Sequence, residues 1–284
     1  MKFYFILFVS LTFCSFELFS QREMFPYDPT PAEITDYPFI DSTMFRVHYR
    51  MLAMNDVSKP DDKTENIMLL QIGRSVSKFF NYHRFLADSL SNALALKNTP
   101  RSVVNNKVVP LMARTTPLNI FKNYPKGKIT TIDRVPFNSY TYEENMEPPK
   151  WKLENGSQIV CGYNCKKATT YLFGRNYTAW YAPEISISDG PWKLFGLPGL
   201  ILKAEDDKGH YSFECITIEK PNWKDVIYNI SYKPFIVKKE QFFNLQKRYY
   251  ENPAATVENS GLIQSPLPSS ANKSRPYNPI ELSE

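Results

Sequence analysis

Residues 189–205 read DGPWKLFGLPGLILKAE, and glycine and proline supply five of the ten residues from Gly190 to Gly199. Their neighbours in this stretch are large and apolar. A solvated loop would not be this apolar, and a regular strand or helix would not hold so much glycine and proline. The stretch therefore predicts a tight, buried turn that leads directly into a strand. Its signature residues are Asp189, Gly190, Pro191, Gly196, Leu197, Pro198 and Gly199.

The first twenty residues have the pattern of a signal peptide. Met1 and Lys2 precede a largely apolar run from Phe3 to Phe13, and no acidic residue occurs before Glu17. The run is shorter than the roughly twenty apolar residues that span a bilayer. We expect cleavage after residue 20 and export to the periplasm or to the extracellular side of the cell surface.

The rest of the chain predicts one folded unit with extensions at both ends. We expect an N-terminal lead over residues 21–33, a single β-rich core domain over 34–251 and a flexible polar tail over 252–284. The tail is rich in proline, serine and asparagine and cannot bury a core of its own. Residues 277–282 at its end have a more specific sequence than the rest of the tail. Two interpretations of them stay open, an ordered anchor and a sorting element.

The sequence of the core domain predicts mostly strands. In residues 43–51, apolar and polar side chains alternate, which is typical of a half-buried antiparallel strand. The segment Asp206–Gly209 predicts a hairpin with positive φ at glycine. We expect a mainly β (α+β) fold, with a curved antiparallel sheet or half-open barrel and one or two helices packed on it. The expected helices are 85–96 and 237–252, and the other expected strands are 66–72, 75–82, 118–122, 128–134, 138–143, 150–153, 157–161, 165–172, 177–182, 199–205, 210–218 and 226–232.

The formal net charge is +5, and the basic residues are scattered along the chain. Nucleic-acid binding would require clustered lysine and arginine, so we expect no nucleic-acid partner. Peripheral contact with anionic membrane headgroups remains open.

Three cysteines follow the signal peptide, namely Cys161, Cys165 and Cys215. An exported protein can form disulfides, and an odd number leaves one thiol over. Two cysteines four residues apart on one strand are too distant for a bridge. We favour a disulfide between Cys215 and either Cys161 or Cys165 over three free, buried thiols.

Several segments together resemble one known family. In order, they are Leu69–Gly73, Ser77–Phe80, Gly162–Ala168, Gly174–Arg175, Tyr177–Tyr181, Asp189–Trp192 and Gly196–Ile201. This pattern resembles the GLPGLI family of secreted proteins of Bacteroidetes-type bacteria. The resemblance implies an exported envelope protein without an established activity, and the end of the tail is similar to the ends of many family members. The segment Thr178–Glu184 is also distantly similar to periplasmic lipoprotein carriers, which are half-open barrels.

No sequence motif identifies a catalytic residue, a metal site or a cofactor, and we expect none of these. The candidate ligand-binding residues are Arg175, Trp180, Tyr181, Trp192 and Phe195. Arg175 beside two aromatic residues could bind a carboxylate or phosphate, although a structural arginine is favoured. The aromatic candidates are also more often core than ligand platform. Asp189 before Gly190 and Pro191 is better explained as a turn residue than as a general base.

Three functions remain open at this point. The favoured one is a non-enzymatic binding module whose curved sheet holds an apolar ligand, a lipid or a peptide. The second is an accessory partner of an outer-membrane transport system that binds through a sheet edge or the tail. The third is a hydrolase or metal-dependent peptidase, which requires His48, Arg175, Asp189 and His210 to converge in one cleft.

Overall fold

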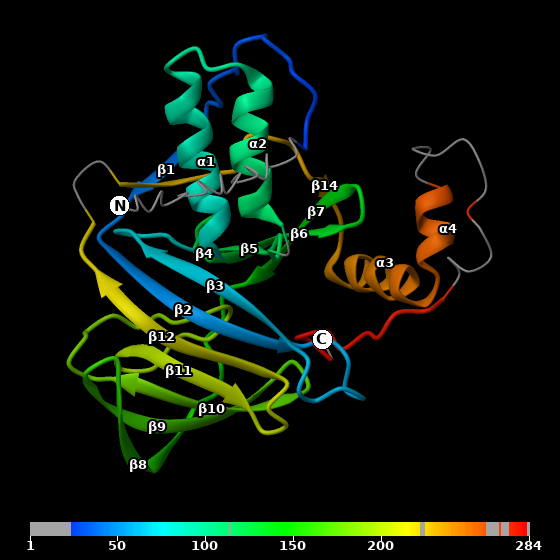
Figure 1. The fold of residues 1–284 in the computed structure, drawn as a ribbon. Coiled ribbons are helices and arrows are strands. Elements are labelled where there is room, and N and C mark those ends of the chain that lie inside the picture. The colour runs from blue at the N-terminus through cyan, green and yellow to red at the C-terminus, as the bar shows by residue number, and fades with distance from the viewer. Residues whose placement is uncertain (1–23, 114, 222–224, 260–266, 268–272, 283–284) are drawn as a thin grey trace, which may run out of the picture.

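The computed structural model describes residues 24–113, 115–221, 225–259, 267 and 273–282. In these residues, twelve strands form one sheet and two further strands form a small second sheet (Figure 1). The large sheet has the order β14-β7-β6-β5-β4-β3-β2-β12-β11-β10-β9-β8, with β14 and β8 at its open edges. The fold is therefore mainly β with an unclosed sheet, as the sequence predicts. The predicted signal peptide lies outside the described residues.

Two meanders build the large sheet. One runs from β2 to β7 and the other from β8 to β12, and the antiparallel pairing of β2 with β12 joins them. The parallel pairing of β14 with β7 adds one edge. The strands of the large sheet are β2 (Phe45–Met54), β3 (Lys63–Ile72), β4 (Ser77–Asn81), β5 (Asn119–Lys122), β6 (Lys128–Val135), β7 (Asn138–Asn145), β8 (Lys152–Val160), β9 (Tyr163–Leu172), β10 (Arg175–Ala182), β11 (Leu200–Asp206), β12 (Tyr211–Glu219) and β14 (Phe235–Ile236). The small sheet pairs β1 (Phe39–Ser42) with β13 (Val226–Tyr228).

The alternating pattern of β2 places one row of side chains in the core. Val47 and Tyr49 are fully buried, and their partners across the strand pair are Leu70 and Met68 of β3. Because successive residues of a strand face opposite sides, this row lines a single face of the sheet. The Tyr49 hydroxyl donates a hydrogen bond to the Ile201 carbonyl at 2.7 Å and ties β2 to β11.

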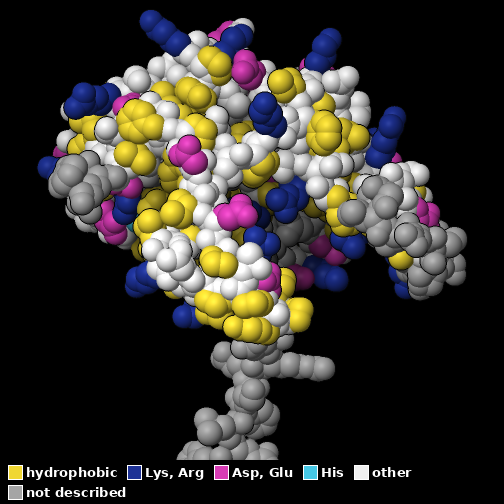
Figure 2. All heavy atoms as spheres, turned by 90° about the horizontal axis from the view of Figure 1, so that it is seen from above, with side chains coloured by type: hydrophobic (Ala, Val, Ile, Leu, Met, Phe, Trp, Pro, Cys, Tyr) yellow, Lys and Arg dark blue, Asp and Glu magenta, His cyan; other side chains and the backbone are white. Residues whose placement is uncertain are grey.

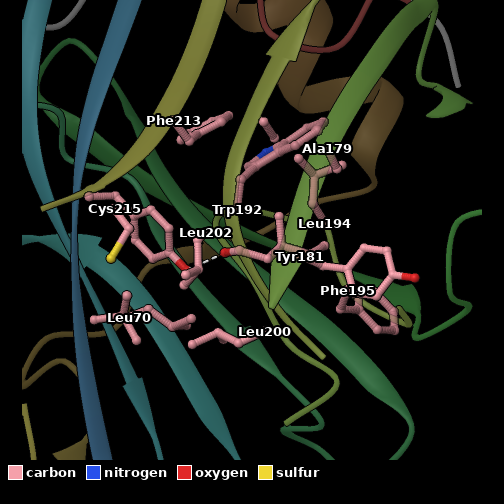
Figure 3. Packing of buried hydrophobic residues seen from close by; sticks show 14 of the residues in the cluster. Leu70, Ala179, Tyr181, Trp192, Leu194, Phe195, Leu200, Leu202, Phe213 and Cys215 are labelled. Atoms are coloured by element: carbon pink, nitrogen blue, oxygen red, sulfur yellow. Dashed lines mark hydrogen bonds between the residues drawn. The ribbon is translucent and has the colours of Figure 1, made fainter. Parts of the chain in front are cut away.

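The sheet curls strongly, and the chain itself fills the concave side. Ile129 on β6 and Ala179 on β10 belong to one hydrophobic cluster although several strands separate them. The connection from β10 to β11 carries Trp192, Leu194 and Phe195 into this cluster, where Figure 3 shows them among side chains of the sheet. The predicted turn is confirmed on both counts. Its side chains Trp192, Leu194 and Phe195 are buried, and β11 begins at the residue after Gly199.

The described residues form four helices, which is more than the one or two expected, and α1 and α3 contact the large sheet. The helices are α1 (Tyr82–Ala95), α2 (Arg101–Met112), α3 (Lys239–Glu251) and α4 (Pro253–Glu258). In Figure 1, α1 and α2 stand side by side, and they share a small core with Ala87 and Val104. Phe242 of α3 packs on Tyr142 of β7. No helix in the described residues is long and apolar enough to cross a membrane. On the face that Figure 2 shows, lysine and arginine side chains lie scattered among hydrophobic and acidic ones.

The end of the predicted polar tail is bound to the folded domain in the structure. Residues 275–282, which we call the C-terminal segment, run back from α4 toward the sheet (Figure 1). The Arg275 amide donates to the Tyr250 carbonyl at 2.7 Å, and the Leu282 amide donates to the Phe173 carbonyl at 2.9 Å. The anchor that the sequence left open for residues 277–282 is present in the structure.

Some predicted boundaries are also corrected. The strands expected over 150–153 and 157–161 form the single strand β8, whose register shifts between Glu154 and Ser157. The strand expected over 226–232 ends at Tyr228. The hairpin between β11 and β12 is confirmed, with Gly209 at φ 64°.

Candidate functional site

The predicted ligand-binding residues do not share one pocket in the described part of the chain. Tyr181, Trp192 and Phe195 belong to the hydrophobic core inside the curled sheet. Trp180 is half-buried at the margin of this core, beside Gly156 of the edge strand β8. Of the five predicted residues, only Trp192 lines the large cavity described below.

Arg175 is buried and binds the C-terminal segment. One terminal nitrogen donates to Asp206 at 2.8 Å, and the other donates to the Asn278 side chain at 2.8 Å and to the Pro279 carbonyl at 2.7 Å. The Nε atom donates to the Ile280 carbonyl at 3.0 Å. The guanidinium group therefore serves as a structural anchor and already has a carboxylate partner within the chain.

Two further hydrogen bonds hold the same segment at Asn278. The Tyr211 hydroxyl donates to the main-chain carbonyl of Asn278 at 2.6 Å, and the side-chain amide of Asn278 donates to the Met54 carbonyl at 2.6 Å. The ring of Tyr211 also lies under Arg175, 4.9 Å from the guanidinium carbon. The sheet thus recognises an extended stretch of peptide mainly through main-chain carbonyl groups.

A buried cluster of charges fixes the end of the C-terminal segment. The Lys193 ammonium group pairs with Glu144 and, at 2.6 Å, with Glu281. Lys239 bridges the same two carboxylates, at 2.6 and 2.8 Å. Burial opposes ionisation of Glu144, but the two ammonium groups hold the pKa of that carboxyl below its usual value. The cluster links the buried turn, β7, α3 and the C-terminal segment.

Asp189 has a structural partner at the start of the buried turn. It pairs with the buried Lys122 of β5, whose ammonium group also donates to the Gly190 carbonyl at 2.7 Å. Asp189 accepts a further hydrogen bond from the Gly190 amide at 2.7 Å. A Cβ atom at Gly190 would lie 2.7 Å from Cβ of Ile201, so glycine is required for close packing there. These contacts agree with the interpretation of Asp189 as a turn residue.

The four residues that a hydrolytic centre would require do not converge. Arg175 and His210 are close, with 3.2 Å between a guanidinium nitrogen and Nδ1. His48 instead lies 3.5 Å from a Glu219 carboxylate oxygen. Asp189 is paired with Lys122 as described above. The arrangement of these side chains does not support the hydrolase hypothesis.

Cys161, Cys165 and Cys215 are all free thiols, and the expected disulfide is not formed in the structure. Cys161 and Cys215 are nevertheless neighbours that share a side-chain hydrogen bond. Burial raises the pKa of Cys165 to about 11 and that of Cys215 well above its usual value. A thiol is reactive only as the thiolate, so both buried thiols should be inert in the folded protein.

We therefore expect thiol labelling at pH 8 to distinguish the cysteines. A thiol with a pKa of about 11 carries at least about 100-fold less thiolate at pH 8 than an ordinary cysteine. The partly exposed Cys161 should therefore react first, and the buried Cys165 and Cys215 only after denaturation. Time-resolved alkylation with mass spectrometry measures this order. Fast labelling of Cys215 in the folded chain would contradict the burial, and a mass lower by two hydrogens would show an oxidised pair.

A large cavity lies where the curled sheet meets α3 and the C-terminal segment. It has a volume of about 690 Å³. Its walls carry aromatic rings and many hydrogen-bonding side chains, and the C-terminal segment forms one wall from Arg275 to Glu281. The other lining residues are Met51, Ala53, Asn55, Thr64, Asn66, Thr115, Thr116, Pro117, Leu118, Thr131, Asp133, Arg134, Tyr142, Trp192, Tyr211, Phe243, Gln246 and Tyr250.

Asp133 and Arg134 place charge in this large cavity. Burial raises the pKa of Asp133 to about 6, against the opposing effects of the Arg134 amide and of two nearby guanidinium groups. The Gln246 amide of α3 also reaches Asp133, at 3.5 Å. The cavity therefore combines aromatic surface with a carboxyl group, a guanidinium group and amides.

Sequence reasoning missed three buried lysines, Lys78, Lys122 and Lys193, which are 1%, 1% and 2% exposed. Each stands beside aromatic residues within an apolar run, in the segments SKFF, IFKNY and PWKLF. A lysine is rarely buried without a specific partner, so this pattern is a usable signal. Sequence reasoning also missed the aromatic and amide residues of α3 that line the large cavity.

Comparison with known families finds a partial match to one family whose function is unknown. A family described as a protein of unknown function (Porph_ging) matches residues 174–203, which include Arg175, Trp192 and the buried turn. The narrower resemblance to the GLPGLI family stays a prediction. No curated protein sequence matches the chain.

Two solved structures are similar to part of this chain. Both are of PNGF-II, in the P21 and C2 space groups, with 13% and 14% sequence identity to this chain and a TM-score of 0.46 each. They cover 74% of this chain and 34% and 33% of theirs. The chain thus spans about a third of the length of the solved proteins it matches.

Proposed function

We propose that this protein is an exported, non-enzymatic binding module that holds an extended peptide in its large cavity. One observation carries the proposal. The cavity of about 690 Å³ is continuous with the C-terminal segment, which the sheet already binds as an extended peptide through its carbonyl groups. A second stretch of peptide would find the same type of surface beside it.

The lining of the cavity favours a peptide over a lipid. Lipid-binding sites are mostly apolar, whereas this cavity presents amides and hydroxyls from Asn55, Thr116 and Gln246 together with the charges of Asp133 and Arg134. The apolar concavity that the sequence suggested as a ligand site is occupied by the buried turn. The aromatic walls suit peptide side chains, because aromatic rings offer large contact area at low conformational entropy.

An accessory role in outer-membrane transport is the second candidate. The nine-residue edge strand β8 exposes Leu153 and Ile159, which are 61% and 70% exposed. An edge strand has unpaired main-chain groups and can accept a strand from a partner. Binding through β8 would not depend on the large cavity, so the experiment below separates the two candidates.

The test is selection of peptides from a random display library on the immobilised mature chain, followed by calorimetry with the selected peptides. Thr64→Trp places a large side chain on the cavity wall, and Glu65→Trp is its matched control on the opposite face of β3. We expect binding to weaken by at least about tenfold in Thr64→Trp and to stay unchanged in Glu65→Trp. Equal affinity of both variants would refute the cavity as the site and favour the β8 edge.

A further inference from the structure

Lys78 is a buried amine in a second, smaller cavity. It lies on β4, in which every residue is buried, and its Nζ atom donates to the Tyr228 carbonyl at 3.0 Å. The rings of Phe80 and Tyr228 flank this nitrogen, each with its centroid at 4.0 Å, and the ring of Phe121 lies at 5.4 Å. The amine is therefore held in an aromatic surrounding.

Lys78 differs from the other two buried lysines in its partners. Lys122 pairs with Asp189, and Lys193 pairs with two glutamates, whereas no ion pair of Lys78 occurs in the described residues. Burial disfavours the charged form and lowers the pKa of Lys78 to about 7, partly opposed by the charge of Asp88. A substantial fraction of this amine is thus neutral and nucleophilic near neutral pH.

The cavity beside Lys78 has a volume of about 260 Å³ and contains groups that can hold a proton. The Tyr228 hydroxyl donates to Asp88 at 3.1 Å, and Tyr37 bonds the same carboxyl group. Burial raises the pKa of Asp88. Arg84, Arg134 and the half-exposed Tyr232 are also among the lining residues. Because Arg134 and Tyr232 are exposed, the cavity opens to solvent, and its two guanidinium groups favour an anionic occupant.

We propose that Lys78 captures small carbonyl compounds that carry a carboxylate, such as 2-oxo acids, as a reversible imine. The nitrogen lone pair attacks the carbonyl carbon and forms the C–N bond, while the carbonyl π electrons move to oxygen. Both protons of the neutral amine leave with that oxygen as water when the C=N bond forms. The step needs no oxidant or reductant, and the arginines would bind the carboxylate.

Reductive trapping with glyoxylate tests this inference on the intact mature chain. Glyoxylate and cyanoborohydride convert an imine into a stable carboxymethyl-lysine, which peptide mass mapping locates. At pH 7, an ordinary lysine is less than about 0.1% neutral, so we expect Lys78 to be labelled at least about 100-fold faster than the exposed Lys59. Propionaldehyde, which lacks the carboxylate, should label Lys78 more slowly than glyoxylate does.

Two results would overturn the inference. Labelling of Lys78 no faster than that of Lys59, or only after unfolding in urea, would show that the amine is merely structural. Equal rates for glyoxylate and propionaldehyde would refute the role of the arginines. Lys78→Met and Lys78→Arg should each abolish the fast label without affecting that of Lys59. None of these readouts depends on peptide binding in the large cavity.

Discussion

Replacement of Arg175 by methionine is expected to lower the free energy of unfolding by about 3–5 kcal/mol. The substitution leaves the Asp206 carboxylate, whose side chain is fully buried, without its cation. It also removes the donors that hold the Pro279 and Ile280 carbonyls. Urea unfolding followed by circular dichroism measures the loss. Hydrogen exchange at the Leu282 amide should become faster, because this amide belongs to the released segment.

Arg50→Met is the matched control for this prediction. Arg50 also pairs with a carboxylate, Glu65, but at 3.5 Å and with both side chains about half exposed. Exposed pairs contribute little, so this variant should lose less than about 1 kcal/mol. A loss in Arg175→Met no larger than that in Arg50→Met would contradict the anchoring role of Arg175.

Gly199→Ala should produce a loss of similar size, about 3 kcal/mol or more, from steric overlap and backbone strain together. Gly199 ends the buried turn with φ 148°, a conformation that favours glycine. A Cβ atom there would lie 2.3 Å from the Ala182 carbonyl oxygen and 2.9 Å from Cα of Pro183. Both contacts involve backbone atoms, at the last residue of β10 and at the residue after it, which cannot move without displacing the strand end or the turn. The midpoint of urea unfolding measures the effect.

Gly162→Ala separates the steric effect from backbone strain alone. Gly162 has φ 82°, and a Cβ atom there would meet nothing within 4 Å. Its replacement should therefore lower the free energy of unfolding by only about 1–2 kcal/mol. If Gly199→Ala and Gly162→Ala were equally stable, the close approach of the turn to Ala182 would not be a determinant of the fold.

Local patterns predict most of the elements of this fold. The alternation in residues 43–51 correctly predicts a strand with one buried face, and the density of glycine and proline at 189–199 correctly predicts a buried turn. Local patterns do not predict α2, because this helix contains Pro110 and has no strong apolar face. Tertiary packing of Val104 and Val108 against α1 stabilises this helix, and a local pattern does not contain that information.

The candidate sites are less accessible to sequence reasoning, because residues far apart in the chain form them. Arg175 is 103 residues from Asn278, and Lys193 is 88 residues from Glu281. Nothing local reveals that these basic residues bind the C-terminal segment rather than a ligand. Consequently, the residues that resemble a family signature fill the core and anchor the chain end, whereas the large cavity lies beside them.

Native mass spectrometry of the mature chain purified from a bacterial periplasm tests whether the large cavity holds a peptide. We expect a bound species that yields peptide fragments, dissociates on denaturation and is missing from Thr64→Trp but present in Glu65→Trp. A bound lipid, a bare mass in the unmodified chain, or a peptide adduct that persists in Thr64→Trp would contradict a peptide-binding cavity at this site.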